Sequence, residues 1–140
     1  MSSAPPVRFE DIGVGQSLPT LRVEVTTSSI VASAMATRDF HPIHHDLDKV
    51  RELGHSELFL NIFASNAYVE RFVSQWAGSE ARLSKMSIRL GAPCYADNTL
   101  RIEGTVSGLE VAPMRWVEIE IRAYGNETVH ASGNVRLEWP

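Results

Sequence analysis

The sequence predicts an α+β fold in which an antiparallel sheet curls around one apolar helix. Two observations lead to this prediction. A long apolar stretch with helical periodicity occupies the middle of the chain, and stretches of alternating apolar and polar residues follow it to the end. Because consecutive strands joined by short turns pair antiparallel, these stretches are expected to form one meander that encloses the helix.

The elements expected before the central helix are short. Residues 20–26 ("TLRVEVT") alternate apolar and polar side chains, which predicts a strand with one buried face. The Ser/Thr cluster that opens residues 27–38 can cap a helix ending near Arg38. Asp46 can then cap one or two helical turns that stop at Gly54.

The central helix is predicted over residues 61–78 ("NIFASNAYVERFVSQWAG"), with Asn61 as its cap and Gly78 as its end. Its apolar positions recur every three to four residues. They are Ile62, Phe63, Ala67, Val69, Phe72, Val73, Trp76 and Ala77. Since these positions cover a broad surface, the helix is expected to be largely enclosed.

Four strand-like stretches follow, at residues 82–93, 99–109, 114–124 and 128–139. The segments "YADN", "GLEVAP" and "YGNE" supply turn residues between them. An antiparallel sheet wrapped around one central helix is the hotdog fold. The whole chain, residues 1–140, is predicted to form a single hotdog domain, with the proline-rich residues 1–6 as a flexible arm.

Composition excludes several classes of protein. The 140 residues fit one domain, and a net charge of −4 with scattered basic residues argues against nucleic acid as a partner. The single cysteine, Cys94, is expected to be a buried structural thiol in a reducing compartment. No stretch has the length of a membrane span or the apolar core of a signal peptide, so a cytoplasmic location is expected.

The stretch "RDFHPIHHD" (residues 38–46) is the densest group of titratable side chains in the chain. It fits a metal site, a catalytic pair or a polar loop. Zinc sites favour cysteine ligands or histidine pairs on a helix, and this loop has neither, so no metal is predicted. Asp39 and His44 flank Pro42, which stiffens the loop, and both side chains can face one water. Taken in isolation, these two residues are better explained as a structural Asp–His pair that closes the loop onto the sheet.

Residues 39–44 ("DFHPIH") resemble the Asp-x-Asn-Pro-Ile/Leu-His motif of the MaoC-like, R-specific enoyl-CoA hydratases. Residues 9–19 ("FEDIGVGQSLP") resemble the N-terminal strand of that family. Residues 88–106 ("IRLGAPCYADNTLRIEGTV") resemble its later strand pair, and the apolar helix from Asn61 resembles its central helix. The resemblance therefore spans nearly the whole chain.

This resemblance implies a function for each site residue. Asp39 and His44 would be the catalytic pair that adds water to a 2-enoyl-CoA. Backbone N–H groups at Asn61 and Ile62, at the start of the helix, would polarise the thioester oxygen. His41 stands where the family has Asn and is expected to be a polar contact near the substrate. The acyl-CoA is itself the substrate, so no cofactor is expected.

The chain also departs from the family at the helix start, where many members carry glycine and this sequence has Asn61. The larger side chain is expected to narrow the site, which puts the usual short-chain substrates in doubt.

A narrower resemblance comes from "ATRDFHPIHHDLDK", "FLNI" and "WAG". These segments resemble the small single-hotdog subunit of actinobacterial steroid side-chain hydratases. That resemblance implies a cholesterol- or bile-acid-type acyl-CoA substrate. It also implies a dimer of hotdogs, either homomeric or with a second MaoC-like subunit in a heterotetramer. An uncovered sheet edge independently favours pairing.

Two alternatives remain open at this stage. Hotdog acyl-CoA thioesterases place a carboxylate on or near the central helix, for which Glu57 and Glu70 are the candidates. A non-catalytic subunit that shapes a partner's pocket is the other alternative, although such a subunit has no need of Asp39 and His44. The sequence does not decide which of the pair activates water and which delivers the proton.

Overall fold

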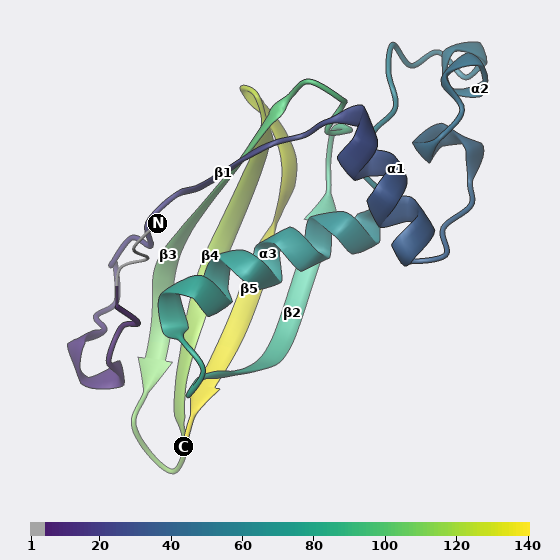
Figure 1. The fold of residues 1–140 in the computed structure, drawn as a ribbon. Coiled ribbons are helices and arrows are strands. Elements are labelled where there is room, and N and C mark those ends of the chain that lie inside the picture. Colours follow the sequence, from purple (N-terminus) through teal and green to yellow (C-terminus); the bar gives the residue numbers. More distant parts are fainter. Residues whose placement is uncertain (1–4) are drawn as a thin grey trace.

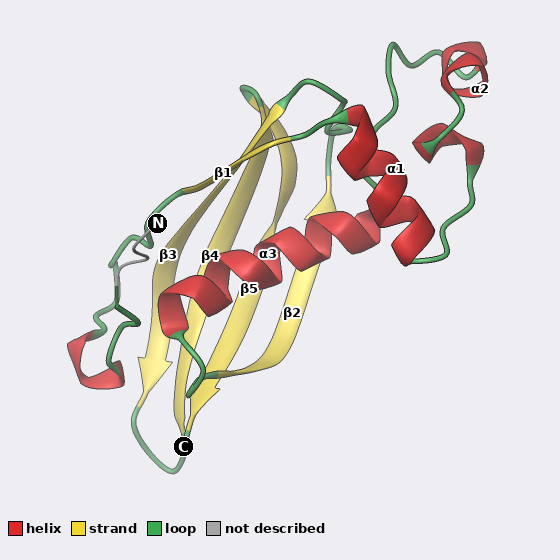
Figure 2. Ribbon diagram, in the orientation of Figure 1, coloured by secondary structure: helices red, strands yellow, loops and turns green. Residues whose placement is uncertain are grey.

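The computed structural model describes residues 5–140 and confirms an α+β hotdog fold, with the long helix α3 lying across one face of an antiparallel sheet (Figures 1 and 2). Most of the predicted N-terminal arm, residues 1–4, lies outside the described residues. Pro6 already lies against Gly78, and the N–H of Val7 donates to the carbonyl of Trp76 at 3.0 Å.

The helices and strands follow one another in the predicted order. They are the 3-10 turn Phe9–Asp11, β1 Leu21–Glu24, α1 Thr27–Ala36, the 3-10 turn Pro42–His44, α2 Leu47–Glu52, α3 Ile62–Ala77, β2 Arg82–Leu90, β3 Thr99–Glu110, β4 Arg115–Gly125 and β5 Thr128–Trp139. None of the helices within residues 5–140 combines the length and the apolar character needed to cross a membrane.

The caps of α2 and α3 are the predicted residues, whereas the cap of α1 lies one residue before the predicted Ser/Thr cluster. Thr26 caps α1, Asp46 caps α2 and Asn61 caps α3, each by accepting a backbone N–H of the first turn, and Gly78 ends α3 with φ +78°. Helix α1 ends at Ala36, slightly before the predicted end near Arg38.

The strand order is β1-β3-β4-β5-β2, and this corrects the prediction of one uninterrupted meander. Only β3, β4 and β5 are neighbours in sequence order. Strand β2 pairs with β5 at the far edge, so the pair expected within residues 88–106 is not adjacent in the sheet. Residues 91–98 instead cross from the β2 edge to β3. The N–H of Leu60 donates to Cys94 O at 3.0 Å, and the N–H of Ala96 donates to Leu58 O at 2.9 Å, so the crossing is fixed to the chain just before α3.

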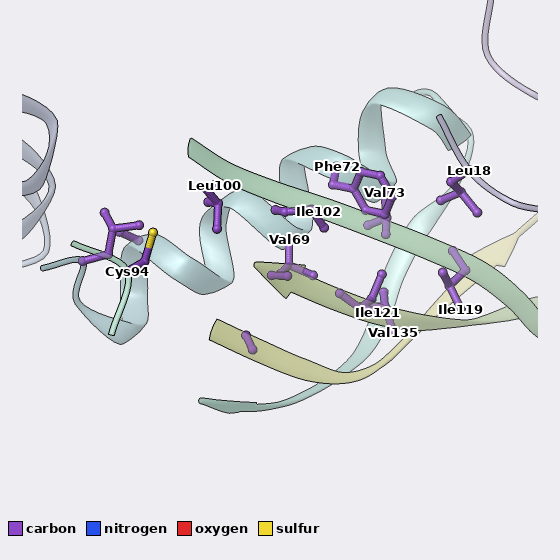
Figure 3. Close-up of a cluster of buried hydrophobic side chains, with 14 of the residues drawn as sticks. Leu18, Val69, Phe72, Val73, Cys94, Leu100, Ile102, Ile119, Ile121 and Val135 are labelled. Carbon is purple, nitrogen blue, oxygen red and sulfur yellow. The ribbon is translucent and has the colours of Figure 1, made fainter. Parts of the chain in front are cut away.

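The core lies between α3 and the sheet (Figure 3). Its central contacts join Val69, Phe72 and Val73 of α3 to Ile102, Ile119 and Ile121 of β3 and β4. Gly104 on β3 allows the close approach, because a Cβ there would lie 2.8 Å from the Phe72 ring and 3.1 Å from the Ile119 side chain.

The outward face of α3 is not enclosed in the single chain, which corrects the expectation of a largely enclosed helix. Ile62 and Phe63 are 44% and 53% exposed, and Ala67 is exposed as well. The sheet covers only one side of the helix, so these apolar side chains face away from it.

The close approach at Gly104 predicts that Gly104→Ala lowers the free energy of unfolding by about 1–3 kcal/mol, because the added methyl overpacks the core. Gly108→Ala on the same strand is the matched control: its Cβ would meet Trp116 at an ordinary 3.6 Å. That control should be neutral or slightly stabilising, by less than about 1 kcal/mol. Urea unfolding of both variants measures this, and equal effects would contradict the packing account.

Candidate active site

Asp39, His44 and Asn61 come together at the N-terminal end of α3. In Figure 1 this end of the helix lies beside α1. The chain reverses at Arg38, whose φ is +56°, and the N–H of Asp39 then donates to Ala34 O at 2.9 Å. Asp39 Oδ2 lies 3.4 Å from His44 Nε2. His44 is buried, whereas the Asp39 side chain keeps 23% of its surface exposed, so solvent reaches the pair from the Asp39 side.

The tautomer of His44 follows from its second contact. His44 Nδ1 lies 2.7 Å from the carbonyl oxygen of Phe59. Because a carbonyl only accepts hydrogen bonds, Nδ1 carries the proton, and Nε2 of the neutral ring is an acceptor. The Phe59 carbonyl is itself held in place, because the residues on either side of it, Leu58 and Leu60, bond to the crossing at residues 94–96.

Asp39 receives hydrogen bonds from two other groups. Asn61 Nδ2 donates to its Oδ2 at 3.2 Å, and the N–H of His41 donates to its Oδ1 at 3.4 Å. Asn61 is 2% exposed and also donates to Thr37 Oγ1 at 2.9 Å. Each carboxylate oxygen thus faces a donor from the protein.

This geometry presents two acceptors side by side. When the carboxyl of Asp39 carries no hydrogen and the His44 ring carries its one hydrogen on Nδ1, Oδ2 and Nε2 have no hydrogen to share across their 3.4 Å separation. A water placed between them can donate one hydrogen to each. Such a water is held and made nucleophilic, which is what general-base catalysis requires.

The start of α3 adds free backbone donors. The Asn61 side chain accepts the N–H of Ala64 at 2.9 Å, while the N–H groups of Ile62 and Phe63 belong to the first turn and have no intrahelical acceptor. The helix dipole places partial positive charge at the same point. A developing negative charge on a thioester oxygen would be stabilised there.

His41 has a local contact within the loop. Its Nδ1 accepts the N–H of Ile43 at 3.3 Å, and the residue is exposed. Among residues 5–140, no three His, Cys, Asp or Glu side chains gather in a way that could hold a metal ion. Cys94 is buried as expected, and burial raises the pKa of its thiol to about 11.

Sequence reasoning missed a second buried histidine contact near α3. His130 is 2% exposed; its Nδ1 donates to Ala92 O at 2.8 Å, and its Nε2 lies 2.8 Å from Ser65 Oγ. Ser65 lies one helical turn after Asn61 on the same face, a spacing that could have indicated an inward hydroxyl. No sequence pattern indicates that Thr37 accepts a hydrogen bond from Asn61 or that the Phe59 carbonyl accepts one from His44.

No protein-family model matches the chain. It is 35% identical over 126 residues to the 3-oxo-4,17-pregnadiene-20-carboxyl-CoA hydratase beta subunit of Mycobacterium tuberculosis, a match that covers 89% of this chain and 94% of the relative. The chain therefore belongs to the MaoC-like enoyl-CoA hydratase family.

Solved structures agree with this assignment. A chain of the ChsH1-ChsH2 complex from Mycobacterium tuberculosis superposes with a TM-score of 0.85 at 32% identity, over 91% of this chain and 98% of that one. The (R)-hydratase from A. caviae involved in PHA biosynthesis superposes with a TM-score of 0.86 at 16% identity, over 94% and 99% of the two chains, and supports the fold alone.

The burial of His130 predicts that stability depends on pH. Burial lowers the pKa of His130 below its ordinary 6.5, because apolar surroundings disfavour the imidazolium. Below that pH the unfolded chain binds a proton that the folded chain does not, so the free energy of unfolding decreases as pH falls from 6.5 toward the folded-state pKa. Urea unfolding near pH 8 and near pH 5.5 should show a smaller pH difference for His130→Asn than for the unchanged chain. Equal pH differences in the two proteins would contradict this.

Proposed function

We propose that the chain catalyses the addition of water to a 2-enoyl-CoA thioester, with Asp39 and His44 sharing the reacting water. The observation that carries the proposal is the pair of acceptors, Asp39 Oδ2 and His44 Nε2, 3.4 Å apart beside the N-terminus of α3. Family membership supports the same chemistry. The fixed Phe59 carbonyl keeps His44 Nε2 free to accept.

The reaction uses these groups in one sequence. The water oxygen bonds to the β-carbon while one of its protons passes to the acceptor pair, and the α,β π-electrons shift toward the thioester oxygen. The N–H groups of Asn61 and Ile62, together with the neighbouring N–H of Phe63, would stabilise that oxygen. The proton held by the pair then passes to the α-carbon as the thioester carbonyl re-forms, so that the product gains one hydrogen and one hydroxyl and the pair returns to its starting charge.

The proposed substrate is an acyl-CoA whose acyl group is the side chain of a steroid. The relative from Mycobacterium tuberculosis is named for such a substrate. Near the pair, Phe40, Ile62 and Phe63 expose large apolar surface, at 61%, 44% and 53%. Apolar walls of this size suit a bulky acyl group.

We also propose that a second hotdog chain completes the site. Hollows of about 420 and 430 Å³ on this chain lie away from the pair, one beside Phe9 and Trp139 and one on β4 and β5. Strand β2 is paired on one side only, and the outward face of α3 is apolar. A second chain that covered this face would enclose the substrate, and the ChsH1-ChsH2 neighbour is a complex of two proteins.

Neither carboxylate that the thioesterase alternative requires is held beside the start of α3. Glu57 pairs with Arg51 at 3.6 Å, and Glu70 is exposed further along α3. Neither residue makes one of the contacts that hold Asp39 and His44. The geometry therefore favours hydration.

The proposal predicts that loss of the enoyl-thioester absorbance depends on both acceptors. Asp39→Asn and His44→Asn should each lower kcat/KM by about 10²–10⁴-fold, the usual contribution of a general acid or base. His45→Asn, at an exposed neighbouring position, is the matched control and should stay within about threefold. Wild-type rates in either acceptor variant would refute the assignment.

The same assay separates the finer proposals. A steroid side-chain enoyl-CoA and a short 2-enoyl-CoA are compared, first with the chain alone and then with the chain co-purified with a second MaoC-like protein. Preference for the short substrate in both preparations would discard the steroid assignment. Full activity of the chain alone as a homodimer would discard the heteromeric assembly.

A further inference from the structure

We propose that Asn61 is a positioning residue for the catalytic carboxylate: its side-chain amide holds Asp39 so that Oδ2 faces His44 Nε2. This inference rests on the proposed hydratase function. It assigns the Asn61 side chain a role separate from that of the backbone N–H groups at the helix start.

Every hydrogen-bonding atom of the amide is engaged. Nδ2 donates to Thr37 Oγ1 at 2.9 Å and to Asp39 Oδ2 at 3.2 Å, and Oδ1 accepts the N–H of Ala64 at 2.9 Å. The reverse orientation of the amide would set its NH₂ group against the Ala64 N–H, donor against donor. The contacts therefore fix which atom of Asn61 faces Asp39.

The backbone that carries the Asn61 side chain is held in place by hydrogen bonds. The carbonyl oxygen of Asn61 accepts the N–H of Ser65 at 3.1 Å, and Ser65 Oγ lies 2.8 Å from His130 Nε2 on β5. His130 in turn donates to Ala92 O at 2.8 Å. The first turn of α3 is thus bound to the sheet and to the crossing, and Asn61 has little freedom to move.

Asp39 has few other restraints. It lies in a loop just after the left-handed Arg38, and its side chain is partly exposed. The His41 N–H reaches Oδ1 only at 3.4 Å, and His44 with its one ring hydrogen on Nδ1 offers none on Nε2. Of the two hydrogen bonds that the protein donates to this carboxylate, the one from the Asn61 amide is the shorter. Without it, water can replace the contact and the side chain can turn away from His44.

The two functions of Asn61 can be separated. Helix capping uses Oδ1, whereas positioning uses Nδ2. Serine is an equally good helix cap but offers no amide donors. Asn61→Ser therefore removes the contact with Asp39 and keeps the cap. Thr37→Val removes the hydroxyl that accepts the other amide hydrogen while leaving the Asp39 contact in place, and so is the matched control.

Steady-state kinetics with the enoyl-CoA that the wild type turns over tests the proposal. Asn61→Ser should lower kcat by about 10–100-fold, since small misplacements of reacting groups have effects of this order. KM should stay within about twofold, because the substrate is still bound. Thr37→Val should retain kcat within about threefold. Circular dichroism melting controls for stability, and Asn61→Asp, which keeps the cap and the side-chain size, should lose at least as much kcat as Asn61→Ser, because its carboxylate would also repel that of Asp39.

A raised KM with unchanged kcat would make Asn61 a substrate contact, and unchanged kinetics would leave it a helix cap; either result overturns the proposal. If the wild type hydrates no enoyl-CoA in any assembly, the proposed function fails. The positioning role is then decided by a crystal structure of Asn61→Ser. Displacement of Asp39 Oδ2 from His44 supports the role, and an unmoved Asp39 refutes it.

Discussion

The hydrogen bond from His44 Nδ1 to the carbonyl oxygen of Phe59 decides what the site can do. It fixes the tautomer, and the tautomer makes Nε2 an acceptor that faces the Asp39 carboxylate. The carbonyl is in position only because residues 58–60 pair with the crossing between β2 and β3. The same local pairing therefore fixes both the crossing that joins β2 to β3 and the carbonyl that orients His44.

The N-terminus of α3 is the second constraint. The first turn of α3 supplies free N–H groups, a cap and the amide that contacts Asp39. At the C-terminal end of the helix, the carbonyl of Trp76 accepts the N–H of Val7. On one face of the helix, Phe72 packs against Gly104 of the sheet, whereas the apolar side chains of the other face are exposed. A single chain thus places the reacting groups and leaves the apolar wall unfinished, which is why we propose a second hotdog chain.

Much of the fold could be predicted because its signals are local. The alternation in 114–124, the apolar period of 61–78 and the caps at Asp46 and Asn61 depend on neighbouring residues alone. The position of β2 beside β5 could not be predicted, since turn residues indicate where a strand ends but not which strand it pairs with.

The same distinction holds for the site. Asp39 and His44 lie close in sequence and could be found as a motif. The Phe59 carbonyl carries no side-chain signal, and Thr37 and His130 reach Asn61 and Ser65 across 24 and 65 positions of sequence. The enclosure of α3 was overestimated because a periodic pattern marks apolar positions without showing which of them the same chain covers.

The most direct test of the account is the protonation pattern of the His44 ring. Long-range ¹H–¹⁵N correlation spectroscopy of the ¹⁵N-histidine-labelled protein, at a pH where the imidazole is neutral, reports which nitrogen carries the hydrogen; His44→Asn identifies the signal. The account predicts a hydrogen on Nδ1 and a free Nε2. A hydrogen on Nε2 would mean that His44 donates directly to Asp39, and would contradict the shared-water site.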